Sequence, residues 1–147
     1  MHTNRLVPSD VSPEVYKALL NVDAALQQST LSKKLMELVK IRASQINGCA
    51  FCLSLHTQEA RRRGETQRRL DVLAGWRDAD IYTAAEKAAL TWTESLTHIS
   101  ERHASDEEYH ALTVHFTDKE IVDLTTLVGL INLFNRLAIS MRYAVTD

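Results

Sequence analysis

Residues 32–64 have the sequence SKKLMELVKIRASQINGCAFCLSLHTQEARRRG, which contains two helix patterns separated by a break. Ser32 is suited to cap a first helix, whose apolar residues recur at intervals of three and four. Asn47-Gly48 interrupts this pattern, and a second helix is predicted from about Cys49 to Arg63. Gly64 follows directly, and glycine often ends helices because it tolerates a positive φ. The stretch therefore predicts two consecutive helices joined by a tight turn.

Helix signals continue on both sides of this stretch. Ser12-Pro13 predicts the start of an N-terminal helix, because proline suits the first helical position. A short helix is predicted from Gln67 to Leu73. Three sequences of the capping-box type follow, in which Ser or Thr precedes Glu by three residues; they begin at Thr83, Ser105 and Thr117. We therefore expect an all-α fold, a single domain over residues 1–147 that forms a bundle of six to seven helices.

The composition narrows the class of protein. The chain has 147 residues, of which 45% are hydrophobic and 24% charged, as expected for one globular domain. Four glycines and two prolines leave few turns for an all-β fold. The formal net charge of −2 argues against a general nucleic-acid binder, which usually carries a basic surplus.

Neither a membrane span nor a secretory signal is expected. The most apolar stretch, residues 121–139, is interrupted by polar and charged side chains, namely Asp123, Asn132, Asn135 and Arg136. Residues 1–8 contain no apolar run of the kind that signal peptides have. We therefore expect a cytoplasmic protein, in which thiols are kept reduced.

The two cysteines of the chain lie three residues apart at the start of the second predicted helix. At 3.6 residues per turn, Cys49, Cys52 and His56 share one face of that helix. His56 is one turn beyond Cys52 and is placed to accept its thiol proton. Cys49 lies in the first turn, where the helix dipole favours a thiolate. The opposite face, with Phe51 and Leu55, is expected to pack against the rest of the protein. The spacing thus predicts a dithiol that can form a disulfide and exchange electrons.

Two other interpretations use the same residues. The cysteines can serve as small hydrophobic residues, or as a redox sensor, in a helical module without catalysis. Alternatively, Cys49, Cys52 and His56 can bind Zn²⁺ together with an acidic residue, although the chain lacks a second pair of ligands at typical spacing. The residues also leave open which cysteine attacks a substrate, since the helix dipole favours Cys49 and the nearby imidazole favours Cys52.

Residues 44–61 resemble the core motif of the alkylhydroperoxidase D-like proteins, which belong to the carboxymuconolactone decarboxylase superfamily. The resemblance continues through Trp76-Arg77, residues 86–94 and residues 131–137, and thus covers nearly the whole chain. It implies helical subunits that assemble as trimers or hexamers. It also implies a thiol peroxidase that uses a peroxide substrate and a dithiol or protein reductant, with no metal or organic cofactor. Residues 32–64 would form the redox core.

The resemblance assigns roles to four residues. It implies that Cys52 attacks the peroxide and that Cys49 resolves the product. Family members also have a glutamate twelve residues before the first cysteine, and Glu37 occupies this position. Glu37 and His56 would then form the proton relay that serves both cysteines.

Two observations complicate this assignment. Three lysines surround Glu37 within one helical turn, and this charge pattern alone predicts an exposed, salt-bridged glutamate; they are Lys33, Lys34 and Lys40. In addition, Phe51 stands where the best-studied branch of the family has a histidine, so one proton carrier of that branch is missing here.

Overall fold

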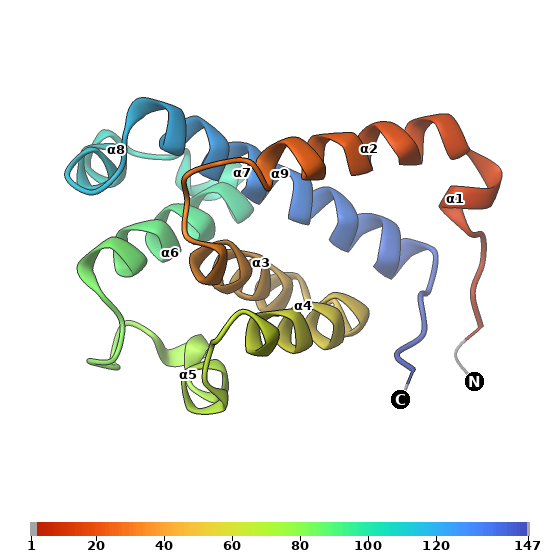
Figure 1. The fold of residues 1–147 in the computed structure, drawn as a ribbon, viewed down its shortest axis with the longest axis horizontal. Coiled ribbons are helices and arrows are strands. Elements are labelled where there is room, and N and C mark those ends of the chain that lie inside the picture. Colours follow the sequence, from red (N-terminus) through yellow and green to blue (C-terminus); the bar gives the residue numbers. More distant parts are fainter. Residues whose placement is uncertain (1–2, 147) are drawn as a thin grey trace.

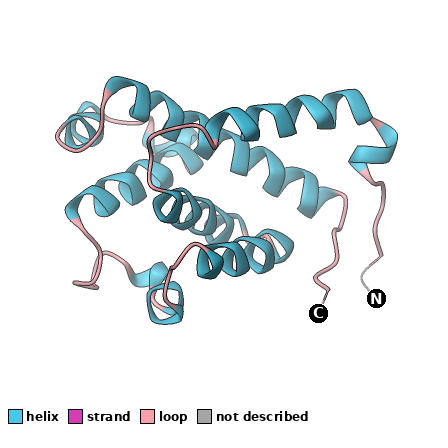
Figure 2. Ribbon diagram, viewed as in Figure 1, coloured by secondary structure: helices cyan, strands magenta, loops and turns pink. Residues whose placement is uncertain are grey.

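The computed structural model describes residues 3–146, and every regular element in this range is a helix (Figures 1 and 2). The elements are α1 (Pro8–Val11), α2 (Pro13–Leu26), α3 (Lys33–Asn47), α4 (Ala50–Arg62), α5 (Gln67–Asp71), the 3₁₀ helix η1 (Leu73–Gly75), α6 (Ala84–Thr97), α7 (Ile99–Arg102), α8 (Asp106–Thr113) and α9 (Asp118–Ser140). The all-α, single-domain prediction is confirmed. The first two residues of the N-terminal segment, from which we expect no secretory signal, lie outside the described range.

The count of six to seven helices is too low for the described part of the chain. Seven helices lie where the sequence predicts them, and α1 and α7 are additional. Each of the two spans four residues, which is too short for an apolar period to be recognised. The helix predicted from Gln67 to Leu73 is divided, because α5 ends at Asp71 and the chain continues as η1.

The three predicted capping boxes differ in outcome. Those at Thr83 and Thr117 are confirmed, with both reciprocal hydrogen bonds present. For the box predicted at Ser105, only one of the two reciprocal hydrogen bonds is present. Ser105 Oγ accepts from the backbone N–H of Glu108, but the Glu108 carboxylate accepts from Arg102 Nη2 at 2.7 Å instead of from the backbone of Ser105. The glutamate thus joins α8 to α7.

α3 lies at the centre of the bundle, with α4 below it and α9 and α2 above it in Figure 1. Leu35, Met36 and Val39 on one side of α3 join an apolar cluster with α6, α8 and α9. Leu38 and Ile41 on another side join a second cluster with α4, α5 and η1. Because neighbours cover α3 on several sides, even charged residues on this helix are buried.

α9 is the one helix of residues 3–146 that is long and apolar enough to cross a membrane, and half of the stretch concerned is buried inside the molecule. Its amides face α3: Asn47 Nδ2 donates to the side-chain oxygens of Asn132 and Asn135, at 2.9 Å each. Asn135 Nδ2 donates in turn to Ser44 Oγ at 3.0 Å. Two of the polar residues that interrupt the apolar stretch, Asn132 and Asn135, therefore attach α9 to the central helix.

A buried carboxylate joins several helices on the other side of α3. Glu94 of α6 accepts hydrogen bonds from Arg42 Nε and Trp76 Nε1 at 2.9 Å, and from Arg77 Nη1 at 2.5 Å. Arg102 Nη1 of α7 lies 3.6 Å away. Burial favours the neutral acid, but the hydrogen bonds from Arg77, Trp76 and Arg42 outweigh this effect and hold the pKa of Glu94 below its usual value.

Candidate active site

The turn between α3 and α4 positions the two cysteines. Gly48 follows α3 with a φ of 71°, as the Asn47-Gly48 break predicts. The backbone N–H of Cys49 then donates to the carbonyl of Ser44 at 3.0 Å. Cys49 is the N-cap residue of α4, which begins at Ala50, and its sulfur accepts from the backbone N–H of Cys52 at 3.3 Å. Cys49 and Cys52 form a disulfide, with Cα atoms 5.3 Å apart.

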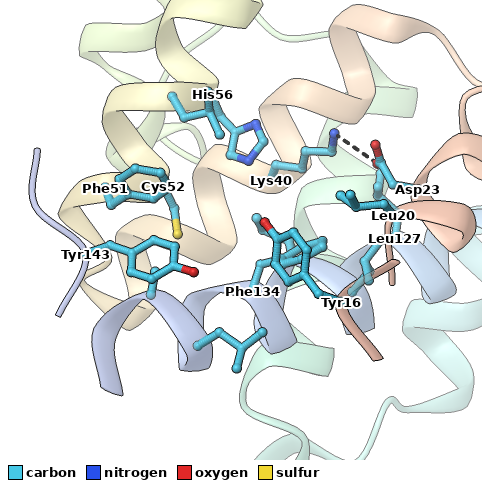
Figure 3. A pocket seen from close by; sticks show the side chains of 15 residues that line it. Tyr16, Leu20, Asp23, Lys40, Phe51, Cys52, His56, Leu127, Phe134 and Tyr143 are labelled. Atoms are coloured by element: carbon cyan, nitrogen blue, oxygen red, sulfur yellow. Dashed lines mark ion pairs between the residues drawn. The ribbon is translucent and has the colours of Figure 1, made fainter. Parts of the chain in front are cut away.

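Cys52 is one of the residues that line a cavity of about 180 Å³ (Figure 3). Residues of α2, α3, α4 and α9 surround it, and Tyr143 from the C-terminal segment completes its wall. The lining is mostly aromatic and aliphatic. Its charged or titratable side chains are Asp23, Lys40 and His56, besides two tyrosine phenols. Cys52 lines this cavity, whereas Cys49 forms the cap of α4, so the two sulfurs have different surroundings.

Glu37 and His56 are brought together by the packing of α3 against α4. His56 Nδ1 lies 3.1 Å from Glu37 Oε2, and Glu37 is only 1% exposed. The interpretation of Glu37 as an exposed residue is therefore wrong, because α3 is covered by neighbouring helices. Its other oxygen, Oε1, lies 3.4 Å from Lys40 Nζ and 3.7 Å from Arg63 Nε.

The charge state of Glu37 determines which ring nitrogen of His56 is free. Burial opposes ionisation of this carboxyl group, but the hydrogen bond to His56 and the charges of Lys40, His56 and Arg63 prevail. They hold the pKa of Glu37 below its usual value. An ionised carboxylate accepts a hydrogen bond, so Nδ1 of His56 is the ring nitrogen that donates to Glu37, and Nε2 is left for other partners. His56 is thus an imidazole held in orientation by a second group.

The packing face of α4 differs from the predicted one. Leu55 is 48% exposed, and both Leu55 and Phe51 line the cavity. Phe51 meets the Tyr143 ring edge-on, at 5.1 Å between ring centroids. The buried residues of α4 are instead Cys52, which clusters with Cys49 and with Ala138 of α9, and Ala60, which joins the cluster that contains residues of α3. The helix therefore packs through its cysteine face, and the disulfide is buried.

Two residues of the cavity, Lys40 and Tyr143, are not predicted from the sequence. The charge pattern around Glu37 predicts Lys40 as a surface partner, although it is buried. Tyr143 reaches the cavity because Arg142 adopts a φ of 58° after α9, and the N–H of Tyr143 donates to the carbonyl of Ala138. No local pattern signals this turn. For Lys40, the apolar residues on several sides of α3 are a signal of burial that could have been used.

Binding of Zn²⁺ by Cys49, Cys52 and His56 is one of the two other interpretations of these residues. Within residues 3–146, no group of three or more His, Cys, Asp or Glu side chains is arranged to hold a metal ion.

Comparison with known proteins supports the resemblance found in the sequence. The model of the carboxymuconolactone decarboxylase family matches residues 13–95. The uncharacterized protein YdfG of Bacillus subtilis is 39% identical over 132 residues, which cover 90% of each chain. The structure of a protein of unknown function from Agrobacterium tumefaciens, proposed to be the antioxidant defence protein AhpD, has a TM-score of 0.95 and 36% identity over 99% of each chain.

A more distant structure shows the same fold. It is the alkylhydroperoxidase AhpD core of an uncharacterized peroxidase-related protein from Ralstonia eutropha, with a TM-score of 0.83 and 23% identity. The match covers 95% of this chain and 74% of the other. The family match, the similarity to YdfG and the close agreement of the folds lead to one conclusion: the chain belongs to the carboxymuconolactone decarboxylase family, as an AhpD-like member.

Proposed function

We propose that this protein is a thiol-dependent peroxidase that reduces a hydroperoxide through a dithiol–disulfide cycle of Cys49 and Cys52. The observation that carries the proposal is the Cys49–Cys52 disulfide at a cavity that also contains His56, whose ring is held by Glu37. The similarity to the Agrobacterium protein, itself proposed to serve antioxidant defence, supports the same class of activity.

The reaction begins with the reduced dithiol. The Cys52 thiol gives its proton to Nε2 of His56, and the thiolate attacks one oxygen of the hydroperoxide. The O–O bond breaks, the alcohol leaves with the proton from His56, and Cys52 becomes a sulfenic acid. The Cys49 thiol then attacks this sulfur, forming the disulfide and releasing water. Two thiols and one hydroperoxide thus give one disulfide, one alcohol and one water.

The surroundings of the two sulfurs support this division of roles. Cys52 lines the cavity, so a peroxide bound there meets its sulfur first. Cys49 occupies the N-cap of α4, where the helix dipole also favours a thiolate. We assign to Cys49 the resolving step and the exchange with the external reductant.

The cycle closes when an external dithiol or protein reductant exchanges with the disulfide and returns both thiols. Such a cycle requires a reducing compartment, and we therefore place the protein in the cytoplasm. The redox core comprises residues 32–64, which contain the cysteines, His56 and Glu37.

Thiol titration before and after one equivalent of hydroperoxide, with metal analysis of the same sample, tests the proposal. We expect both thiols of the reduced protein to be lost and dithiothreitol to restore them, because the product is a disulfide. A sample in which bound zinc protects the thiols, or in which their oxidation is slow and partial, would contradict a peroxidase. The variant with serine at both positions 49 and 52 gives the background.

We also propose that the chain assembles into a homo-oligomer, as a trimer or hexamer. Several large apolar side chains of α2 and α9 are exposed in the single subunit, and burial between subunits would remove them from water; they include Val15, Leu20, Leu133 and Ile139. Light scattering at micromolar concentration is expected to give at least three times the subunit mass of 16.6 kDa. A species of 16.6 kDa alone would show that the subunit is a monomer.

A further inference from the structure

Lys40 places a buried ammonium group in the wall of the cavity. The residue is 7% exposed, and its Nζ lies 3.4 Å from Glu37 Oε1. This nitrogen lies 3.9 Å from Asp23 Oδ1, an ion pair that Figure 3 marks with a dashed line. A buried charge costs free energy unless it is paired, and these two carboxylates are the partners that compensate for its burial. They do not explain why a cation is present in a mostly apolar wall, and the proposed reaction as written above does not use it.

The charges around Lys40 come from three helices. Asp23 belongs to α2, Glu37 to α3, and His56 and Glu59 to α4, which Arg63 follows directly as its C-cap. The helix α9 contributes only apolar side chains to the cavity, and the remaining titratable groups there are the phenols of two tyrosines. Arg63 Nε has its own carboxylate, since Glu59 Oε1 lies 3.4 Å from it. Lys40 is therefore the nearest lysine or arginine to the Glu37 carboxylate.

The position of Lys40 determines which charge the cavity favours. Lys40 is the one lysine or arginine among the residues that line the cavity. In a mostly apolar wall its ammonium group attracts a negative charge, and therefore favours the thiolate of Cys52, which lines the same cavity. The contact with Glu37, which also holds His56, keeps the ammonium group in place.

We propose that Lys40 assists the peroxidase reaction electrostatically: its buried ammonium group favours the thiolate of Cys52 in the shared cavity, and thereby lowers the pH at which this thiol reacts. This inference rests on the proposed function for its purpose. Its physical content, the pH dependence of the Cys52 thiol, does not require any peroxide to be the substrate.

The test measures the rate at which iodoacetamide alkylates Cys52 as a function of pH. Each variant carries Cys49→Ser, so that Cys52 is the one thiol in the chain. Lys40→Gln removes the charge but keeps a polar group of similar reach, and it is expected to move the midpoint of the profile about one pH unit upward. Lys40→Arg keeps the charge and is expected to leave the midpoint within about 0.3 unit of the parent.

Lys119→Gln is the matched control, because it removes a lysine that is paired with Asp123 on the exposed side of α9. Its midpoint is expected to stay where the parent has it. If Lys40→Gln does not fold by circular dichroism, Lys40→Met repeats the measurement with a neutral side chain of similar length. A neutral variant that folds and shows an unchanged or lower midpoint overturns the inference.

The experiments distinguish a failure of the peroxidase proposal from a failure of the role proposed for Lys40. If hydroperoxide leaves the thiols of the parent protein intact, the peroxidase proposal is wrong, whatever the alkylation profiles show. If the parent reduces peroxide and the neutral variants keep its alkylation midpoint, the peroxidase proposal stands and the role of Lys40 is wrong. A merely structural role of Lys40 would lower stability without moving the midpoint.

Discussion

Cys52→Ser is expected to lower the rate of hydroperoxide reduction by roughly 10³-fold or more, to the level of the variant with serine at positions 49 and 52. The reason is that the attacking thiolate is removed and no other thiol lines the cavity. Cys49→Ser keeps this thiolate but lacks the resolving thiol. It is expected to consume one equivalent of peroxide and to form a sulfenic acid that dimedone traps at Cys52. Turnover with a dithiol reductant, followed by mass spectrometry of the trapped product, provides the measurement.

The reverse result in the two single variants would exchange the roles of the cysteines. If Cys52→Ser retains most of the activity and Cys49→Ser forms no sulfenic acid, Cys49 is the attacking residue. The helix dipole would then outweigh the neighbouring imidazole in activating a thiol. Full activity in both single variants would exclude a dithiol cycle altogether.

Glu94→Ala is expected to lower the free energy of unfolding by about 3–5 kcal/mol, the usual cost of removing one member of a buried ion pair. The variant leaves Arg42 and the indole N–H of Trp76 without the acceptor that they share in the folded protein. The midpoint of thermal unfolding should fall by about 10 °C. Glu107→Ala, at an exposed position on α8, is the control and should stay within about 0.5 kcal/mol of the parent. A similar value for both variants would contradict a structural role of the carboxylate.

Glu94 also makes the free energy of unfolding depend on pH. The pKa of Glu94 is lowered in the folded protein, so its ionisation stabilises the fold above the pKa of the unfolded chain, near 4.5. That contribution is lost as the pH falls through the folded-state value. Glu94→Gln lacks the titrating group, and its stability should therefore fall less steeply than that of the parent below about pH 4.5. Urea unfolding at pH 7, 5 and 4 measures this difference.

Local sequence signals predict the helices well because their determinants are local. The caps at Thr83 and Thr117 and the positive φ of Gly48 and Gly64 depend on a few neighbouring residues. The same reasoning fails for Ser105, since Glu108 finds a stronger partner in Arg102 of another helix. A pattern within one segment contains no information about such a competitor.

The candidate site shows where local reasoning ends. The face shared by Cys49, Cys52 and His56 follows from helix geometry, and the two cysteines do lie within bonding distance. The burial of Glu37 follows from the helices that cover α3, which the surrounding lysines do not reveal. The resemblance points to Glu37 because it compares the spacing between this glutamate and the first cysteine with that of other family members. The proximity of Asp23 to Lys40 depends in the same way on how α2 packs beside α3.

The sulfur atom of Cys49 takes part in two different interactions. The sulfur of Cys49 belongs to the disulfide and also accepts the hydrogen bond that caps the first turn of α4. Reduction breaks the covalent link across this turn, but it leaves on Cys49 a thiol or thiolate that can accept the same hydrogen bond. The Cys49→Ser variant replaces this sulfur by a hydroxyl oxygen, which is itself a common helix cap, so the start of α4 is expected to persist when the redox pair is removed.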